Sequence, residues 1–291
     1  MVVVNFNTVD LLRQCLNSLA TFEPRAQVIV VDNASRDGSE IMVSQHFPEV
    51  QIIQSGQNAG FAAANNLGID RSTGEYVILL NSDTRLESEA LTATADWMDA
   101  NPSVGATSPR LIGADDILQT CQYPWPNARD LWRKALKLKI SPMKITTGWL
   151  AGTCLVLRRV TLEQIGGHLD DQYWMYWEDA DLSRQIANKG WLLKPFEGAT
   201  VRHFGGASGG GADATRRADL HAWYLYGKYH WFRKNKGLAG LLSVWILDLL
   251  DLPRKWMRSL RHPERTAERA HAKVQAAALW RFIKGVRPNV P

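Results

Sequence analysis

The chain has 291 residues, of which 45% are hydrophobic and 22% charged, and its formal net charge is +5. This composition excludes a mainly disordered or fibrous chain, and the length suits one α/β catalytic domain with an appendage. Three scattered cysteines exclude a disulfide framework, and no Cys-x-x-Cys pair suggests structural zinc. The N-terminus lacks the basic start and long apolar run of a signal peptide, so we expect a cytoplasmic protein.

The first part of the chain alternates between predicted strands and predicted helices. Short apolar runs predict strands over 2–4, 28–31, 50–53 and 76–80. Apolar or small residues at helical spacing predict helices over 9–19, 39–47, 62–69 and 89–100. This alternation predicts a parallel sheet covered by helices, in which ligands bind at the carboxyl edge of the strands.

The pattern is less regular after Asn101-Pro102, and the segment 121–144 is turn-rich and irregular, so we place the change between two halves of the domain there. An apolar stretch and two short helices follow, at 150–157, 161–165 and 179–187. Five of the seven residues in 205–211 are glycine, which predicts a mobile loop.

Tryptophan, leucine and basic residues dominate the chain beyond residue 213. Apolar residues recur at helical spacing from Leu238 to Trp256, which predicts an amphipathic helix that Pro253 breaks or kinks. The uncharged run between Lys236 and Asp248 is well short of the ~20 residues needed to span a bilayer, so no transmembrane helix is predicted. Such a helix packs on the catalytic domain or lies on a membrane, and the sequence favours neither.

Basic residues crowd near the C-terminus and suggest an acidic partner surface. They are Arg254, Lys255, Arg258, Arg261, Arg265 and Arg269. No recognised nucleic-acid motif accompanies them, so we expect no nucleic-acid partner. Peripheral contact with the anionic inner face of the cell membrane is the alternative that we keep.

Two aspartates follow predicted strands. Asp32 could accept hydrogen bonds from a nucleotide base or ribose, although it equally suits a turn or a helix cap. Asp83, in Asn81-Ser82-Asp83, follows a fully apolar strand and is well placed for a hard cation such as Mg²⁺ or Mn²⁺. The alternative for Asp83 is an Asx-turn at the strand end.

A helix opens with the three carboxylates of Glu178, Asp179 and Asp181, directly after an aromatic run. Acidic residues suit the positive end of a helix dipole, but an acid among aromatic side chains can acquire the raised pKa of a general base. His203 follows a strand-like stretch, where it is either structural or a ligand for a divalent cation.

Together these segments resemble the family 2 glycosyltransferases, and most closely their bacterial rhamnosyltransferase-like branch. Collinear matches lie at 4–7, 30–35, 58–68, 79–83, 149–152, 166–170 and 176–182. The resemblance covers about 1–210 and is specific for the family but not for the substrate.

The resemblance implies the α/β GT-A fold, in which helices flank a central mixed sheet, here with a C-terminal helical appendage. It implies three regions. They are a nucleotide-sugar-binding half at 1–120, an acceptor-binding and catalytic half at 121–212, and an amphipathic helical region at 213–291.

By the same resemblance, Asp32 contacts the pyrimidine and the segment 58–68 shapes the floor of the nucleotide site. The implied nucleotide-sugar-binding residues are Asn5, Asn7, Asp32, Asn58, Gly60, Asn65, Asn81, Trp149 and Gly152. Asp83 is the metal-binding end of the Asp-x-Asp motif, whose first position here is Asn81. With one carboxylate fewer, His203 is the expected second ligand for Mg²⁺ or Mn²⁺.

The resemblance further implies that Asp179 is the general base of an inverting transfer and that Glu178 orients the acceptor or Asp179. The cation stabilises the departing diphosphate. The first candidate donor is dTDP-L-rhamnose, with UDP-galactofuranose and UDP-hexoses as alternatives. The expected acceptor is a saccharide or a polyprenyl-linked saccharide in cell-surface polysaccharide synthesis. A non-catalytic nucleotide-sugar-binding module is the competing interpretation, and the oligomeric state stays open.

Overall fold

The computed structural model describes residues 1–138, 147–205, 214–261 and 266–290, without the side chains of 214–215, 254–256, 258–261 and 266–272. The chain divides into two compact units: 1–125, 145–171 and 178–211 form the first, and 126–144, 172–177 and 212–291 the second. Residues 206–211 of the glycine-rich segment and the side chains of the C-terminal basic cluster lie outside the described residues.

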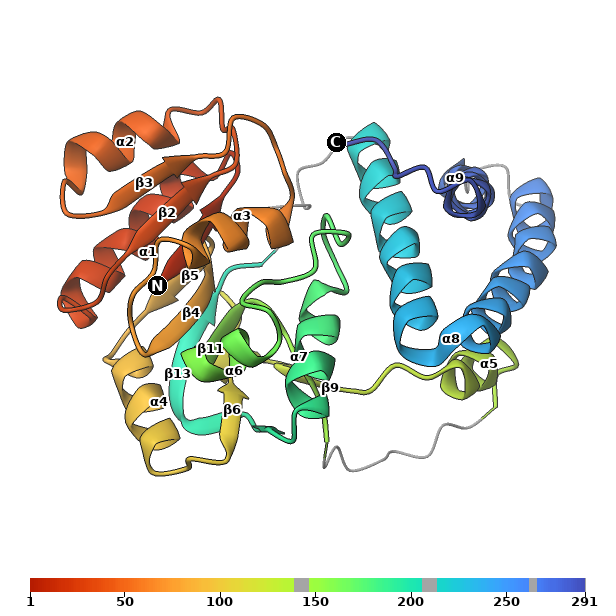
Figure 1. Ribbon diagram of the computed structural model, residues 1–291. Coiled ribbons are helices and arrows are strands. Elements are labelled where there is room, and N and C mark those ends of the chain that lie inside the picture. Colours follow the sequence, from red (N-terminus) through yellow and green to blue (C-terminus); the bar gives the residue numbers. More distant parts are fainter. Residues whose placement is uncertain (139–146, 206–213, 262–265, 291) are drawn as a thin grey trace. The chain divides into compact units, whose positions relative to one another are not determined.

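A seven-stranded mixed sheet forms the centre of the first unit (Figure 1). In sheet order its strands are β12 (Leu192–Leu193), β6 (Val104–Thr107), β11 (Cys154–Arg158), β4 (Tyr76–Asn81), β1 (Val2–Asn5), β2 (Ile29–Asp32) and β3 (Gln51–Gln54). β1, β2, β3 and β4 pair in parallel, as their sequence alternation with helices predicts. β11 runs antiparallel to β4 and β6, which makes the sheet mixed.

Helices cover both faces of this sheet, which explains why its central strands β1, β2, β4 and β11 are largely apolar runs rather than alternating patterns. The helices that pack on one face are α1 (Val9–Phe22), α2 (Ser39–His46) and α4 (Ala90–Asp99). Those on the other face are α3 (Phe61–Ile69), α6 (Arg159–Gln164) and α7 (Glu178–Asn188). Successive strand side chains point to opposite faces, so Val2 and Val3 belong to different core clusters.

Two smaller sheets complete the first unit. The four-stranded sheet consists, in order, of β5 (Thr84–Leu86), β13 (Phe196–His203), β7 (Pro109–Ile112) and β8 (Leu118–Gln119). β13 is central and antiparallel to β5, and this pairing sets His203 opposite Thr84, next to Asp83. The other sheet pairs β9 (Gln122–Pro124) with β10 (Gly148–Leu150).

Residues 121–138 of the segment 121–144 are more regular than the sequence indicated, because they contain β9 and α5 (Ala128–Ala135), and 139–144 lie outside the described residues. Asn127 begins α5 as its N-cap, since its side chain accepts a hydrogen bond of 2.8 Å from the backbone N–H of Asp130. The prediction of an irregular stretch was therefore wrong at these residues. The turn residues that suggested a loop include the capping residue of a helix.

The second unit is helical, with the long helix α8 (Ala214–Arg261) and α9 (Thr266–Ile283). α8 breaks at Gly237, where φ is 65° and ψ is −166°, and Figure 1 shows its two arms. Pro253, where we expected a break or a kink, does not break the helix, which continues through that residue; the break is at a glycine, which adopts a positive φ that other residues avoid. No helix within the described residues has the length and apolar character needed to cross a membrane.

Candidate functional site

Polar side chains gather where β1, β2 and β4 end. The register pairs Asn5 with Asp32 and Val4 with Asn81, so these strand ends lie side by side at one edge of the sheet. The Nδ2 of the fully buried Asn5 donates to Asp32 Oδ1 at 2.9 Å and to Ser35 Oγ at 3.1 Å. Asn5 therefore ties the loop after β2 to the end of β1.

Both carboxylate oxygens of the buried Asp32 accept hydrogen bonds from the protein. Oδ1 accepts from Asn5 Nδ2 at 2.9 Å, and Oδ2 accepts from the backbone N–H of Ser35 at 3.0 Å. A carboxylate has about four lone-pair sites, so Asp32 retains acceptor capacity for a ligand. Asn7 is exposed beside it, with a φ of 52°, and its Oδ1 accepts from the backbone N–H of Arg36 at 2.8 Å. Asp32 and Asn7 therefore both stabilise the loop after β2 through their side-chain hydrogen bonds.

Asn33, which sequence reasoning missed, fixes the segment that precedes α3. Its Nδ2 donates to Asn58 Oδ1 at 3.0 Å and to the carbonyl of Gly60 at 3.2 Å, and its Oδ1 accepts from the backbone N–H of Ala59 at 3.0 Å. Gly60 has a φ of 88°, which favours glycine. Asn65 is buried in α3, with an Oδ1 that has no partner among the described residues.

Asp83 and His203 meet at the junction of the central and four-stranded sheets. Asp83 is 5% exposed, and His203 Nε2 lies 3.4 Å from Asp83 Oδ1. The other ring nitrogen, Nδ1, lies 2.7 Å from Gln119 Oε1. The side-chain oxygen of Asn81 is buried without a partner in the described part of the chain. The structure thus brings the two predicted metal ligands together.

The chemistry of this pair fits a divalent cation bound to a diphosphate. Mg²⁺ and Mn²⁺ bind one or two protein carboxylates and complete their coordination shell with phosphate oxygens and water. Mn²⁺ also accepts imidazole as a ligand. Within the described residues no group of three or more His, Cys, Asp and Glu side chains has metal-binding geometry. Two protein ligands are enough for a cation whose other ligands come from the diphosphate of a bound nucleotide.

Asp179 lies in the first turn of α7, where two backbone groups orient its carboxylate. Oδ2 accepts from the N–H of Gly152 at 3.1 Å and Oδ1 from that of Ala180 at 2.8 Å. Burial raises the pKa of Asp179 to about 6, although these hydrogen bonds stabilise the carboxylate and oppose the rise. Asp179 is partly exposed to solvent, so a substrate hydroxyl can reach its carboxylate.

Glu178 is more deeply buried than Asp179. Burial and then the charge of Asp179 raise the pKa of Glu178 well above its ordinary value, and its Oε2 has no partner among the described groups. Two buried neighbouring carboxyl groups do not both ionise readily. The pair therefore favours a single negative charge, and the N–H groups of Gly152 and Ala180 favour its location on Asp179, the candidate base.

The backbone immediately before α7 is unusual. Tyr176 and Trp177 have φ angles of 71° and 73°, a left-handed conformation that is rare for aromatic residues. Their rings belong to the second unit, where Trp177 packs 6.0 Å from Trp231 between ring centroids. Such local strain concentrates at functional sites.

Trp149 lies on β10 and stacks on Tyr123 of β9, with ring centroids 4.7 Å apart. The backbone N–H of the adjacent Leu150 donates to Ser183 Oγ of α7 at 3.1 Å, and the charge of Asp179 contributes, after burial, to the raised pKa of Tyr123. Trp149 is thus on the Asp179 side of the site rather than at the ends of β1 and β2.

Gly152 connects these groups. A Cβ atom built on it would lie 3.4 Å from the ring of Phe61 and 3.5 Å from the Cβ of Asp179. Phe61 directly follows Gly60, and the backbone N–H of Asn81 donates to the carbonyl of Thr153 at 2.9 Å. The predicted nucleotide-binding segment, the metal pair and Asp179 therefore share one region of the first unit.

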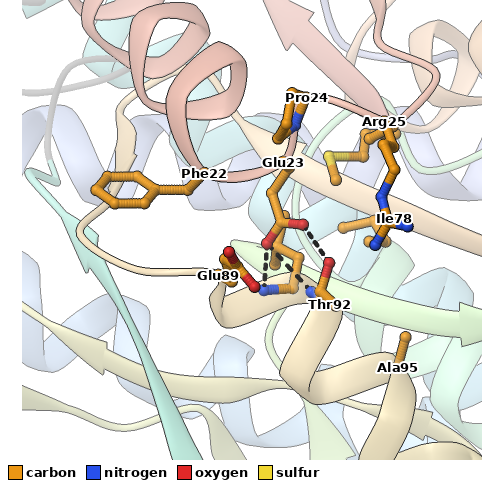
Figure 2. A pocket seen from close by; sticks show the side chains of 11 residues that line it. Phe22, Glu23, Pro24, Arg25, Ile78, Glu89, Thr92 and Ala95 are labelled. Carbon is orange, nitrogen blue, oxygen red and sulfur yellow. Dashed lines mark hydrogen bonds between the residues drawn. The ribbon is translucent and has the colours of Figure 1, made fainter.

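A cavity of about 420 Å³ lies near the start of β1, away from these residues, and is lined by Met1, Glu23, Arg25 and residues of α4 (Figure 2). The Glu23 carboxylate caps α4 there, since it accepts from the backbone N–H groups of Leu91 at 2.9 Å and Thr92 at 3.1 Å. None of the predicted site residues lines this cavity, and the capping bonds explain its buried charge.

Comparison with known proteins gives a consistent result. The family model described as glycosyl transferase family 2 matches residues 1–166. The chain is 31% identical to the N-acetylglucosaminyl-diphospho-decaprenol L-rhamnosyltransferase of Mycobacterium tuberculosis, over 70% of this chain and 74% of that protein. It is 25% identical to the low-salt glycan biosynthesis hexosyltransferase Agl10 of Haloferax volcanii, over 62% of this chain and 59% of that protein.

Solved structures share the fold at low sequence identity. The mannosyltransferase PcManGT of Pyrobaculum calidifontis, in complex with GDP-Man and Mn²⁺, gives a TM-score of 0.54 at 18% identity, over 97% of this chain and 86% of that one. TarS 1–349 of S. aureus gives a TM-score of 0.55 at 14% identity, over 98% of this chain and 90% of that one.

Proposed function

Because the chain belongs to glycosyl transferase family 2, we propose that it transfers a sugar from a nucleotide donor in an inverting reaction that requires Mg²⁺ or Mn²⁺. The observation that carries this proposal is the convergence of two sets of residues in one region of the first unit. One set is the Asp83–His203 pair, and the other is Asp179 with its raised pKa.

Asp83 and His203 would hold the cation, which when bound supplies a Lewis acid for the departing diphosphate. Asp179, with a pKa of about 6, is mostly ionised at neutral pH. It takes the proton of the acceptor hydroxyl while that oxygen bonds to the anomeric carbon. The bond from this carbon to the diphosphate breaks with its electron pair, and the configuration inverts. Gly152 and Ala180 orient the base through their N–H groups.

The donor that we propose first is dTDP-L-rhamnose, and the acceptor is a saccharide or a polyprenyl-linked saccharide of a cell-surface polysaccharide. Support comes from the similarity to the mycobacterial protein, whose name specifies an L-rhamnosyltransferase and a diphospho-decaprenol acceptor. UDP-galactofuranose and UDP-hexoses are the alternative donors. A module that binds nucleotide sugars without turnover is the competing function.

We also propose a cytoplasmic location with peripheral contact to an anionic membrane. The second arm of α8 exposes a row of apolar side chains while Leu241 and Val244 are fully buried. The exposed residues are Leu238, Leu242, Ile246, Leu249 and Leu250. The exposed Arg233 and Lys236 precede this row, which suits insertion beside anionic headgroups.

A donor screen tests the proposed reaction. Purified protein with Mn²⁺ or Mg²⁺ is incubated with a panel of nucleotide sugars, and release of the nucleoside diphosphate is followed with and without EDTA. Release from one donor that EDTA abolishes supports the proposal and names the donor. Binding of dTDP or UDP without release, even with saccharide acceptors present, supports the non-catalytic module, and absence of nucleotide binding contradicts both.

A further inference from the structure

Gln119, at the end of the edge strand β8, contacts His203 through both ends of its amide. Its Nε2 lies 3.1 Å from the backbone carbonyl oxygen of His203, and its Oε1 lies 2.7 Å from His203 Nδ1. A backbone carbonyl only accepts hydrogen bonds, so the amide NH₂ must face it and the amide oxygen must face the ring. Because the amide oxygen also only accepts, Nδ1 must carry a proton.

The proton on Nδ1 determines whether the other ring nitrogen of His203, Nε2, carries a proton or a lone pair. In a neutral imidazole only one nitrogen is protonated, so Nε2 then carries a lone pair. That lone pair faces Asp83 Oδ1 at 3.4 Å, in a position where Asp83 is nearly inaccessible to solvent. Two facing acceptors of this kind are stabilised by a cation that both can bind.

The surrounding backbone holds Gln119 in place. β8 pairs with β7, where Gln119 lies opposite Leu111, and β7 in turn pairs with β13. A Cβ atom at Gly113 would lie 3.3 Å from Gln119 Nε2, so the amide occupies space that the absent side chain leaves. The amide is therefore constrained by its neighbours as well as by its hydrogen bonds.

We propose that Gln119 is a positioning residue that fixes the Nδ1-protonated form of His203, and thereby aims Nε2 at the cation shared with Asp83. The inference rests on the proposed cation site and adds a residue to it. Partners of this kind typically change metal affinity by about 10–100-fold.

Mn²⁺ binding gives the first test. Mn²⁺ is titrated into protein saturated with dTDP or UDP, and free Mn²⁺ is measured by electron paramagnetic resonance. Gln119→Leu is expected to weaken Mn²⁺ binding about tenfold or more, because the ring loses its orienting acceptor. Gln122→Leu is the matched control: that amide donates to the carbonyl of Leu193 at 3.4 Å, so affinity should stay at the wild-type value.

A double-mutant cycle separates positioning from a general structural role. If Gln119 acts through the ring, Gln119→Leu has no further effect on Mn²⁺ affinity in a His203→Ala background. The same loss in both backgrounds overturns the inference. If His203→Ala leaves Mn²⁺ affinity unchanged, the proposed cation site itself fails. If His203→Ala weakens binding and Gln119→Leu does not, only the role of Gln119 fails.

The ring can also be observed directly, without metal. The ¹⁵N shifts of the imidazole nitrogens report which one is protonated, and the His203→Ala spectrum assigns the signals. The wild-type protein is expected to show a protonated Nδ1 and an unprotonated Nε2 at a pH where the ring is neutral, and Gln119→Leu should lose this bias. A wild-type ring protonated at Nε2 contradicts the inference.

Discussion

Asp179→Asn removes the proposed proton acceptor while it preserves the volume of the side chain. Loss of a general base lowers rates by about 10²–10⁴-fold, so we expect at least a hundredfold lower transfer rate with nearly unchanged nucleotide affinity. The raised pKa adds a pH signature. Wild-type transfer should rise about tenfold per pH unit below a pKa of about 6 and level off above it, where the carboxylate is ionised.

The stability of the same variant can be estimated from its contacts. Ionised Asp179 is unfavourable in the folded state because its pKa rises from 3.8 to about 6, which corresponds to about 3 kcal/mol. The sign follows from proton binding: between these two pH values the folded state holds a proton that the unfolded state has lost, so stability falls as pH rises. Replacement by Asn removes this penalty.

Asparagine also has a cost, because its NH₂ group faces the N–H of Gly152 or of Ala180 and leaves that donor without an acceptor. An unsatisfied buried group costs about 1–3 kcal/mol, so the two effects nearly cancel and the variant should fold normally. Nucleoside diphosphate release and thermal unfolding measure the two quantities together. A folded Asp179→Asn protein that keeps most of its activity would refute the assignment of the base.

Three further changes test other parts of the site. His203→Ala should raise the Mn²⁺ concentration needed for half-maximal transfer by about tenfold or more, and added Mn²⁺ should restore the rate; failure of the rescue contradicts the ligand role. Asn33→Ala releases the segment before α3, so KM for the donor should rise more than kcat falls, with a stability loss of about 1–3 kcal/mol in thermal unfolding. The double variant Leu242→Glu, Ile246→Glu should no longer float with anionic vesicles. The control Ile41→Glu, which changes an exposed residue of α2, should float like the wild-type protein. Equal flotation of the wild type, the double variant and the control contradicts the membrane contact.

The sequence predicted the central fold well, because its strands are apolar runs and its helices show regular spacing. The family and the GT-A fold implied by the motifs are confirmed by the family match, the mycobacterial relative and the solved structures. Asp32 and Asp83 stood out as candidates because each is a polar residue at the end of an apolar strand, and their roles stay predictions. The geometry of Asp83 with His203, 120 positions apart, followed from the resemblance alone.

Other features depend on contacts that no local pattern encodes. Gln119 meets His203 only because β7 pairs with both β8 and β13. Asn33 lies in the matched segment 30–35, but its three hydrogen bonds to the segment before α3 depend on how the strands pair. The break of α8 lies at Gly237, where φ is 65°, because glycine adopts a positive φ at little steric cost.

Transfer of rhamnose to a defined acceptor tests the central claim most directly. Wild-type protein, Asp179→Asn protein and wild-type protein with EDTA are each given dTDP-L-rhamnose and a short-chain polyprenyl diphosphate saccharide, and the product is followed by mass spectrometry and NMR. We predict a product of inverted anomeric configuration that forms only with the wild-type protein and a divalent cation. A product of retained configuration, or equal transfer in EDTA, would contradict the account.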